Sequence, residues 1–523
     1  MGCSSESVEM ALARRISLAT AFEQTHFDRK IDNRASGMGE AKRRKERERR
    51  AAGFVRPIAR ARFNLYTTGT RNALAPVMAE ERSWWASEDE ALLGLVARDT
   101  NDDDYLWMIL ARDKIGRFRC ADLGINFRSQ EYAETQLRVA MMEIIEKGEI
   151  AEFGEQGDET NSPLDPFDVP PDLDPAKIHP YFRLLADEPG RAPARKVISE
   201  LALWLAPKDP HFVREFQTNG FDQRLWELFL WAALREFGLE VEQLEAPDFK
   251  CRGLGGEFSL EATTVAPSVA GILKDHPDPQ TPEEMDAFLR DYMPMKFGGA
   301  LTGKLKKTNA DGEHYWERPE TRDKPFLIAI ADFHKPTDEE NLGPMTYTQS
   351  ALWQYLYGSR VTWRFENDTL KIDTHPIDEH EFRGKRVPSG FFDEEGAENI
   401  SAVLFSNAGT IAKFDRIGVT AGCGADGYGY FRMGFRPNPD PNAVVGEAFH
   451  VDVTDEDYEE FWTQEIQVFH NPNAKHPLPL EALPGATHHI FKDGVLQSFS
   501  PPDAVLSSFT MLVRYVEDDD LSA

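Results

Sequence analysis

Three acidic residues stand in settings where a carboxylate could do chemistry. Glu227 lies within an almost wholly apolar run, Asp248 follows Pro247, and Glu261 stands in a strand-like segment after a glycine-rich turn. An unpaired carboxylate is costly among apolar side chains, so Glu227 needs a cation, a hydrogen-bond network or a raised pKa. If the three carboxylates met, they would form an oxygen-rich site suited to Mg²⁺ or Mn²⁺. Such an ion could activate water and stabilise charge on a phosphodiester.

A helix and a β-hairpin are predicted to carry these carboxylates. Residues 221–238 are rich in strong helix formers and apolar nearly all round, which predicts a buried helix around Glu227. Asp248 and the segment 257–265 flank the glycine-rich turn, which predicts two paired strands. Side chains alternate between the two faces of a strand, so Glu261 can face Asp248 across the hairpin.

The order of these motifs resembles the core of the PD-(D/E)XK nuclease-like superfamily. That core has a helix glutamate, then a strand aspartate, then a Glu-x-Lys on the following strand. This chain has Glu227, Pro247-Asp248 and Glu261-Ala262-Thr263 in the same order. The resemblance covers roughly residues 195–365. It implies a restriction-endonuclease-like mixed sheet flanked by helices, and metal-dependent hydrolysis of DNA.

Segments outside the motifs carry the resemblance further along the chain. Residues 324–333 look like the next core strand and residues 347–358 like the helix that follows it. Residues 409–418 and 468–474 are similar to segments of uncharacterised bacterial proteins that carry this nuclease-like core. These last segments imply membership of such a family and name no activity.

The chain departs from the superfamily motif at residue 263. Thr263 stands where the superfamily commonly has a lysine that orients the water and stabilises negative charge. Members can supply that lysine from elsewhere, and we expect Lys304, with Lys307 one turn on, to do so from a predicted helix. The alternative for both lysines is a solvated helix face or contact with a phosphate backbone. Asp332, at the end of the predicted strand 324–333, is a second-tier candidate that could instead cap or turn the chain.

Two functions follow from these residues. The first is a divergent Mg²⁺-dependent nuclease in which Asp248 and Glu261 bind the ion, Glu227 supports the ion or its water, and Lys304 assists. The alternative is a catalytically inactive nuclease-like module that binds nucleic acid or a protein partner. The carboxylates also have structural alternatives, because Asp248 could be a turn residue and Glu261 the cross-strand partner of a basic side chain.

The charge balance limits how the chain can bind nucleic acid. The 523 residues carry a formal charge of −30, so contact with DNA must come from local basic patches. Residues 38–62 are predicted to be a basic helical arm, with a solvated terminal helix as the alternative. The candidates for DNA contact in this arm are Lys42, Arg43, Arg44 and Lys45.

Composition divides the chain into regions and predicts an α/β (α+β) fold class. Residues 1–37 are predicted to be a disordered extension or the product of a start site placed before the true one at Met38. The remaining regions are a small α/β domain at 63–151, an acidic Pro-rich linker at 152–192, the nuclease-like core at 193–370 and a β-rich C-terminal region at 371–523.

Several kinds of site and location are disfavoured by the sequence. Four cysteines without CxxC spacing predict neither a disulfide framework nor a zinc site, and they favour a cytoplasmic location. The apolar runs are too short for a membrane span, so no membrane contact is expected. The sequence does not indicate whether the chain forms a homo-oligomer. Two further groups fit no metal-ligand spacing, namely the acidic turn Asp102–Asp104 and the histidines His470, His488 and His489.

Overall fold

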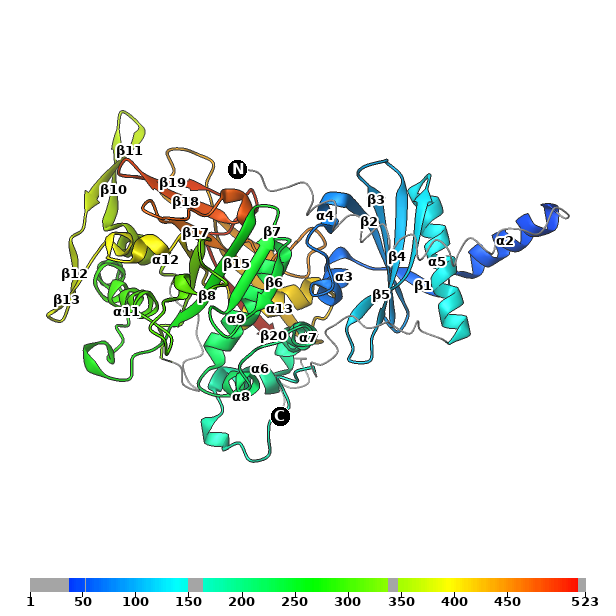
Figure 1. The fold of residues 1–523 in the computed structure, drawn as a ribbon, viewed down its shortest axis with the longest axis horizontal. Helices are drawn as coiled ribbons and strands as arrows, with labels where there is room; N and C mark the ends of the chain where they lie inside the picture. Colours follow the sequence, from blue (N-terminus) through cyan, green and yellow to red (C-terminus); the bar gives the residue numbers. More distant parts are fainter. Residues whose placement is uncertain (1–36, 52, 149–162, 337–346, 516–523) are drawn as a thin grey trace.

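The structure is a computed structural model that describes residues 37–51, 53–148, 163–336 and 347–515. The chain is an α+β protein, which confirms the fold class predicted from the sequence. Two sheets dominate it, a small antiparallel sheet near the N-terminus and a larger mixed sheet (Figure 1). The predicted extension at 1–37 lies outside the described residues except for Gly37. Within the described ranges, no helix is both long and apolar enough to cross a membrane.

The N-terminal sheet is an antiparallel meander covered by one long helix. Helix α5 (Gln130–Lys147) packs Leu137 and Met141 against the sheet side chain Ile109. The hydroxyl of Ser129 caps the start of α5, and Gly148 ends the helix in a left-handed conformation. The five strands, in spatial order, are β1 (Val55–Pro57), β2 (Ala79–Ser87), β3 (Leu92–Asp99), β4 (Tyr105–Arg112) and β5 (Phe118–Phe127).

Three further helices belong to this N-terminal part. The basic helix α2 (Gly37–Ala51) packs against α5 at one end and projects from it at the other (Figure 1). Helices α3 (Arg60–Thr67) and α4 (Ala75–Met78) lie between β1 and β2 in the chain. Helix α3 contacts α7 and α13, so it joins the small sheet to the rest of the molecule.

The larger sheet is mixed and has eight strands. Strands β8, β9 and β14 run parallel, and the hairpin partners β7 and β6 extend the sheet in antiparallel fashion at one edge. In spatial order the strands are β19 (Val495–Phe499), β18 (Thr487–Lys492), β17 (Gln467–His470), β14 (Ala402–Phe405), β9 (Phe326–Asp332), β8 (Gly256–Val265), β7 (Phe249–Gly253) and β6 (Glu240–Gln243).

This order places the boundary expected at residue 370 inside a single sheet. Strands β14, β17, β18 and β19 come from the predicted C-terminal region, yet they continue the sheet that β6 to β9 begin. The apolar run 402–405 is buried on both faces, like β9. A strand that is apolar on both faces fits the interior of a sheet with helices on both sides, and β14 takes that position beside β9.

Helices cover both faces of the mixed sheet. Helix α9 (Phe221–Glu236) packs on the face that carries Leu260 and Ala262, and its buried residues confirm the predicted buried helix. Helices α11 (Met293–Leu305) and α12 (Gln349–Tyr357) pack on the face that carries Ile328 and Ile330. Helix α12 corresponds to the helix predicted at 347–358.

The described part of the expected linker is folded. Residues 163–192 include α6 (Pro180–Asp187), and its Phe182 and Leu185 are buried in the same core as α9. The chain continues through α7 (Ala192–Ala202) and α8 (Phe212–Gln217) into α9. Prolines therefore start helices here rather than interrupt them, because Pro180 and Pro193 stand in the first turns of α6 and α7.

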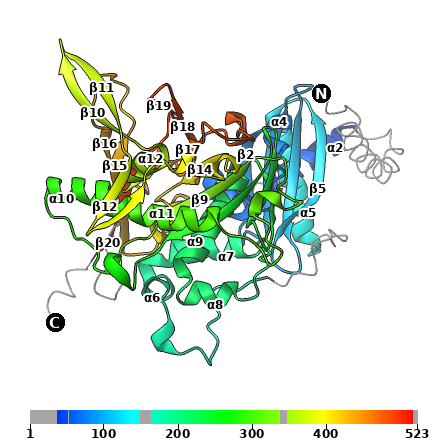
Figure 2. The same cartoon turned by 60° about the vertical axis from the view of Figure 1, so that its left-hand side comes forward.

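The rest of the molecule decorates the mixed sheet. Two hairpins lie at one end of the molecule, and the first of them projects from it in both views (Figure 2). The remaining helices are α10 (Pro282–Ala287), which continues through a π-helical turn (Phe288–Tyr292) into α11, and α13 (Ile411–Thr420), which packs against α7. The hairpins are β10 (Ser359–Glu366) with β11 (Thr369–Pro376) and β12 (Glu379–Phe382) with β13 (Lys385–Pro388), and a three-stranded sheet contains β16 (Glu447–Asp452), β15 (Tyr428–Arg436) and β20 (Ser507–Arg514).

Candidate functional site

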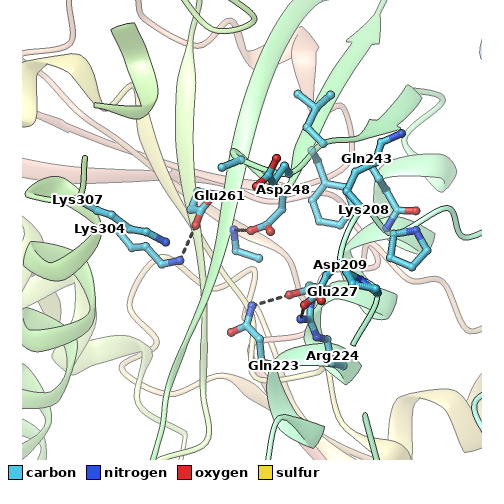
Figure 3. A pocket seen from close by; sticks show the side chains of 17 residues that line it. Lys208, Asp209, Gln223, Arg224, Glu227, Gln243, Asp248, Glu261, Lys304 and Lys307 are labelled. Carbon is cyan, nitrogen blue, oxygen red and sulfur yellow. Dashed lines mark hydrogen bonds and ion pairs between the residues drawn. The ribbon is translucent and has the colours of Figure 1, made fainter. Parts of the chain in front are cut away.

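Glu227, Asp248 and Glu261 line one cavity of about 450 Å³ at the β7 edge of strand β8 (Figure 3). The carboxylates come from three elements, which are helix α9, the start of β7 and strand β8. Helix α9 reaches the cavity from one face of the sheet. Lys304 of α11, and Lys307 two residues beyond the end of that helix, reach it from the other. The structure therefore brings together the trio that the sequence predicts.

The cavity exists because the β7–β8 pairing stops short. Their register begins at Phe249 opposite Leu260, so among the described strands none pairs with the part of β8 after Leu260 on that edge. Asp248 stands just before β7, and its Oδ2 accepts a hydrogen bond from the Ala262 backbone N–H at 2.7 Å. A carboxylate thus takes the place of a strand partner. Glu261, next to Ala262, is consequently reachable from the open edge.

Glu227 is buried and its two carboxylate oxygens each accept a hydrogen bond. The Gln223 side-chain amide donates to Oε1 at 2.9 Å, and the Arg224 guanidinium donates to Oε2 at 2.8 Å. Arg224 also pairs with Glu215 at 2.6 Å and with Asp209. Burial raises the pKa of Glu227, and Arg224 and Gln223 partly offset that rise.

Glu261 holds two donors on one oxygen and none on the other. Its Oε1 accepts from the Lys304 ammonium at 2.5 Å and from the Tyr315 hydroxyl at 2.7 Å. Its Oε2 is buried without a hydrogen-bond partner among the described residues. An unpartnered buried carboxylate oxygen is costly, so this atom is suited to a cation or its bound water.

Asp248 lies where burial and neighbouring negative charge both disfavour its ionised form. Burial raises its pKa well above the ordinary value, and the negative charges of Glu261 and Glu227 raise it further. The Ala262 N–H and the Lys304 ammonium act in the opposite direction. The three carboxylates are therefore close enough for their charges to repel one another. A bound cation would offset this repulsion and favour the ionised form of Asp248.

Both lysines that the sequence proposes line the cavity, but only Lys304 lies on a helix, because α11 ends at Leu305 and the predicted extra turn that would carry Lys307 does not form. Lys304 makes the ion pair with Glu261, and Lys307 lies with its ammonium 5.6 Å from the centre of the Tyr315 ring. Thr263 follows two residues after Glu261 in β8 and is buried, but it is not among the residues that line the cavity. The positive charge beside Glu261 thus comes from a helix and not from position 263.

Asp332 lies away from this cavity. It ends β9 opposite Val265, four residues along β8 from Glu261, and is almost fully buried. The Thr348 hydroxyl and the His334 backbone N–H donate to its two oxygens. Burial raises the pKa of Asp332 to about 7. These hydrogen bonds give Asp332 a structural role, because the bond from His334 holds the backbone just after β9.

The basic arm is also separate from the cavity. Its four candidate residues for DNA contact are exposed on α2, whereas two arginines of the same helix, Arg47 and Arg50, form ion pairs with Glu143 and Glu146 of α5. Arg44 pairs with Glu48 one turn on, at 3.3 Å. The exposed positions are Lys42, Arg43, Arg44 and Lys45.

The histidines and the acidic turn have ordinary structural partners. His470 and His488 share a hydrogen bond of 2.9 Å, and His489 bonds to Gln467 and Ser498. Burial lowers the pKa of His470 to about 4, which keeps it neutral. Asp102–Asp104 lies in the turn between β3 and β4, where Asp103 pairs with Arg98.

Sequence reasoning missed three residues that donate hydrogen bonds to Glu227 or Glu261. Gln223 and Arg224 precede Glu227 by four and three residues on a helix, and this spacing alone could have indicated that they reach the carboxylate. Tyr315 stands 54 residues from Glu261, and no local pattern points to their contact.

Comparison with known protein families, with curated proteins and with solved structures found no match. In the described ranges, no group of three or more histidine, cysteine, aspartate and glutamate side chains is arranged to hold a metal ion. Of the three predicted carboxylates, Glu227 directs both oxygens to Gln223 and Arg224, which leaves Asp248 and Glu261 as the pair best placed to hold a cation, and Asp209 and Glu245 also line the cavity.

Proposed function

We propose that the protein is a divergent metal-dependent nuclease of restriction-endonuclease-like fold, and that the cavity is its active site for hydrolysis of DNA phosphodiester bonds. One observation carries the proposal. The Lys304 ammonium lies 2.5 Å from Glu261, so a lysine stands beside the carboxylate that the motif pairs with lysine, although residue 263 is threonine. The protein would cleave its DNA substrate in the cytoplasm, the location favoured by the sequence.

The topology around the cavity supports the fold assignment. A glutamate-bearing helix, α9, packs against β8, and the hairpin of β7 and β8 is followed by the parallel strand β9. This is the order in which the resemblance places the core elements. The helix α12 then follows β9 and covers the face opposite α9.

The residues of the cavity fit a divalent cation. Mg²⁺ prefers oxygen ligands, keeps several waters and is often held by only one or two carboxylates. Asp248 and Glu261 would hold it, and the unpartnered buried Oε2 of Glu261 is the atom best explained by such an ion. When bound, Mg²⁺ or Mn²⁺ would act as a Lewis acid on the phosphate and lower the pKa of a bound water.

The chain's own residues would divide the remaining tasks. Lys304 would place a positive charge next to the scissile phosphate and stabilise the negative charge that develops there. Glu227, held by Arg224 and Gln223, would orient water at the edge of the site. Lys208 lines the cavity and is exposed, so it can contact a phosphate of the DNA backbone. The exposed basic positions of α2 would add contacts farther along the duplex.

A cleavage assay with a matched pair of variants tests the proposal. Purified protein is incubated with plasmid and linear DNA and with Mg²⁺ or Mn²⁺. Asp248→Asn keeps an acceptor for the Ala262 N–H but removes the charge, and we expect it to lower the cleavage rate at least 100-fold, roughly the effect of losing a key charge in an active site. Asp332→Asn removes another buried carboxylate outside the cavity and is expected to cleave like the wild type. Absence of cleavage by the wild type, or equal cleavage by Asp248→Asn, would count against a nuclease.

A second candidate is a catalytically inactive module that binds nucleic acid or a protein partner. Two observations favour it, namely the threonine at position 263 and the lack of a three-residue metal group among the described residues. Calorimetry with Mn²⁺ separates the candidates. An active site should bind the ion and lose it on Asp248→Asn, whereas an inactive module with DNA affinity would bind DNA equally with and without the ion.

A further inference from the structure

We propose that Tyr315 is a positioning residue of the cavity, which together with Lys304 occupies one oxygen of Glu261 and leaves the other for a single divalent cation. The inference rests on the proposed function. It adds a residue that neither the motif nor the sequence pattern indicates, and it states how many ions the site takes.

Both donors meet at the same atom. The Tyr315 hydroxyl donates to Glu261 Oε1 at 2.7 Å, and the Lys304 ammonium donates to that oxygen at 2.5 Å. Tyr315 is fully buried and Glu261 is 4% exposed, so the Tyr315 hydroxyl meets Glu261 largely out of contact with solvent. With Oε1 saturated, the carboxylate cannot turn freely. Its other oxygen, Oε2, is the buried atom without a partner in the described part of the chain.

The fold fixes Tyr315 independently of any ligand. It opens a short 3-10 helix (Tyr315–Glu317) in the segment between α11 and β9, and the Thr321 hydroxyl donates to its carbonyl. Its ring stacks on Phe326 of β9 with centroids 5.6 Å apart. The guanidinium of Arg318, from the same segment, lies 4.9 Å from the centre of the Tyr315 ring. The hydroxyl is therefore aimed at Glu261 by packing, which is how outer contacts orient a metal ligand.

This arrangement limits the number of ions. A second cation bound through Oε1 of Glu261 would have to displace the Lys304 ammonium or the Tyr315 hydroxyl, which both already donate to that oxygen. The positive charge of the Lys304 ammonium would also repel a second cation placed next to Oε1. These contacts favour one cation, held between Asp248 and Oε2 of Glu261.

Calorimetry with Mn²⁺ alone, on the full chain without DNA, tests the inference. The wild type is expected to bind one ion per chain. Tyr315→Phe removes only the hydroxyl and should weaken the affinity roughly 10- to 100-fold, as loss of an outer contact to a metal ligand does. Tyr292→Phe is the matched control. It also loses one hydroxyl of a fully buried tyrosine, which bonds to the Leu273 carbonyl at 3.2 Å, and it should bind like the wild type.

A second variant guards against misfolding of the first. Thr321→Val removes the hydroxyl that holds the Tyr315 carbonyl without touching Glu261, and it should lower the affinity in the same direction but less. Thermal unfolding monitors the fold of every variant. If Tyr315→Phe folds and binds Mn²⁺ as tightly as the wild type, the inference is overturned. If Tyr315→Phe does not fold, wild-type affinity of Thr321→Val overturns it.

Two further outcomes separate this inference from the proposed function. If the wild type binds one ion, Asp248→Asn loses it and Tyr315→Phe does not change it, the role of Tyr315 fails and the metal site stands. Two ions per chain would overturn the stoichiometry alone. A wild type that binds no Mn²⁺ would overturn both the inference and the metal-dependent reaction.

Discussion

Asp248 is held where its charged form is disfavoured unless a cation is present. Burial and the neighbouring carboxylates Glu261 and Glu227 raise its pKa well above the ordinary value. An acid with a raised pKa in the folded state lowers stability as the pH rises past its ordinary pKa, because the unfolded chain ionises first. A site built to bind an ion commonly carries such a cost in the absence of the ion.

The corresponding variant should stabilise the metal-free protein. We expect Asp248→Asn to raise the free energy of unfolding by about 1 kcal/mol at pH 7 in the presence of a chelator. The gain should shrink as the pH falls toward 4, since protonated aspartate is as uncharged as asparagine. Urea unfolding between pH 4 and 8 measures the difference. A gain that is absent at pH 7, or that grows toward low pH, would contradict this account of the cavity.

At the scale of the elements, the β7–β8 hairpin depends on a close approach between distant segments. A Cβ at Gly255, in the turn of this hairpin, would lie inside the contact distance of the backbone at Glu481 and Ala482. Those residues belong to a short 3-10 helix (Leu480–Ala482) of the C-terminal region. Glycine is needed here because of this neighbour, and the hairpin that carries Asp248 and Glu261 is seated against it.

Gly255→Ala is therefore expected to destabilise the protein by about 1–3 kcal/mol, the usual cost of forcing extra atoms into a packed contact. Gly299→Ala is the control. It lies in helix α11 with open space around the added Cβ, and it should stabilise the protein by up to about 1 kcal/mol. Chemical denaturation of both variants measures these changes. Equal effects of the two substitutions would show that the approach of the C-terminal segment does not constrain the hairpin.

At the scale of the whole molecule, a buried ion network connects the C-terminal segments. Lys413 and Arg416 of α13 and Arg432 of β15 surround two carboxylates, Glu460 and Glu465. All five side chains are buried. The three cations lower the pKa of Glu465 to about 2 and that of Glu460 well below its ordinary value, although burial alone would raise both.

Removal of one carboxylate should leave buried cations without a partner. We expect Glu460→Gln to lower the free energy of unfolding by about 3–5 kcal/mol at pH 7. Because the folded-state pKa values are depressed, this stabilisation is present above the ordinary glutamate pKa and is lost as the pH falls toward 2. Acid unfolding followed by circular dichroism should therefore be steeper below pH 4.5 in the wild type than in Glu460→Gln. Parallel acid transitions would refute the role of the network.

The sequence by itself determined the local elements and the order of the carboxylates along the chain. The apolar run around Glu227 gave a buried helix, the glycines before residue 257 gave a hairpin turn, and the run 326–332 gave a buried strand. Each depends on side-chain periodicity or backbone freedom within about a dozen residues, and such signals are readable without knowing the fold. That Lys304 could replace a lysine at position 263 was an inference from nearness in sequence.

Only the tertiary structure decided which groups meet. In the structure, Lys304 and Tyr315 both donate to the same oxygen of Glu261. Asp332 lies outside the cavity, and strands beyond residue 371 belong to the sheet that carries the site. These contacts depend on strand order, on where the β7–β8 register ends and on how a segment packs between α11 and β9. These contacts form between residues that are far apart in the chain. A local sequence pattern reflects the preferences of its own residues and does not indicate which distant residue they will contact.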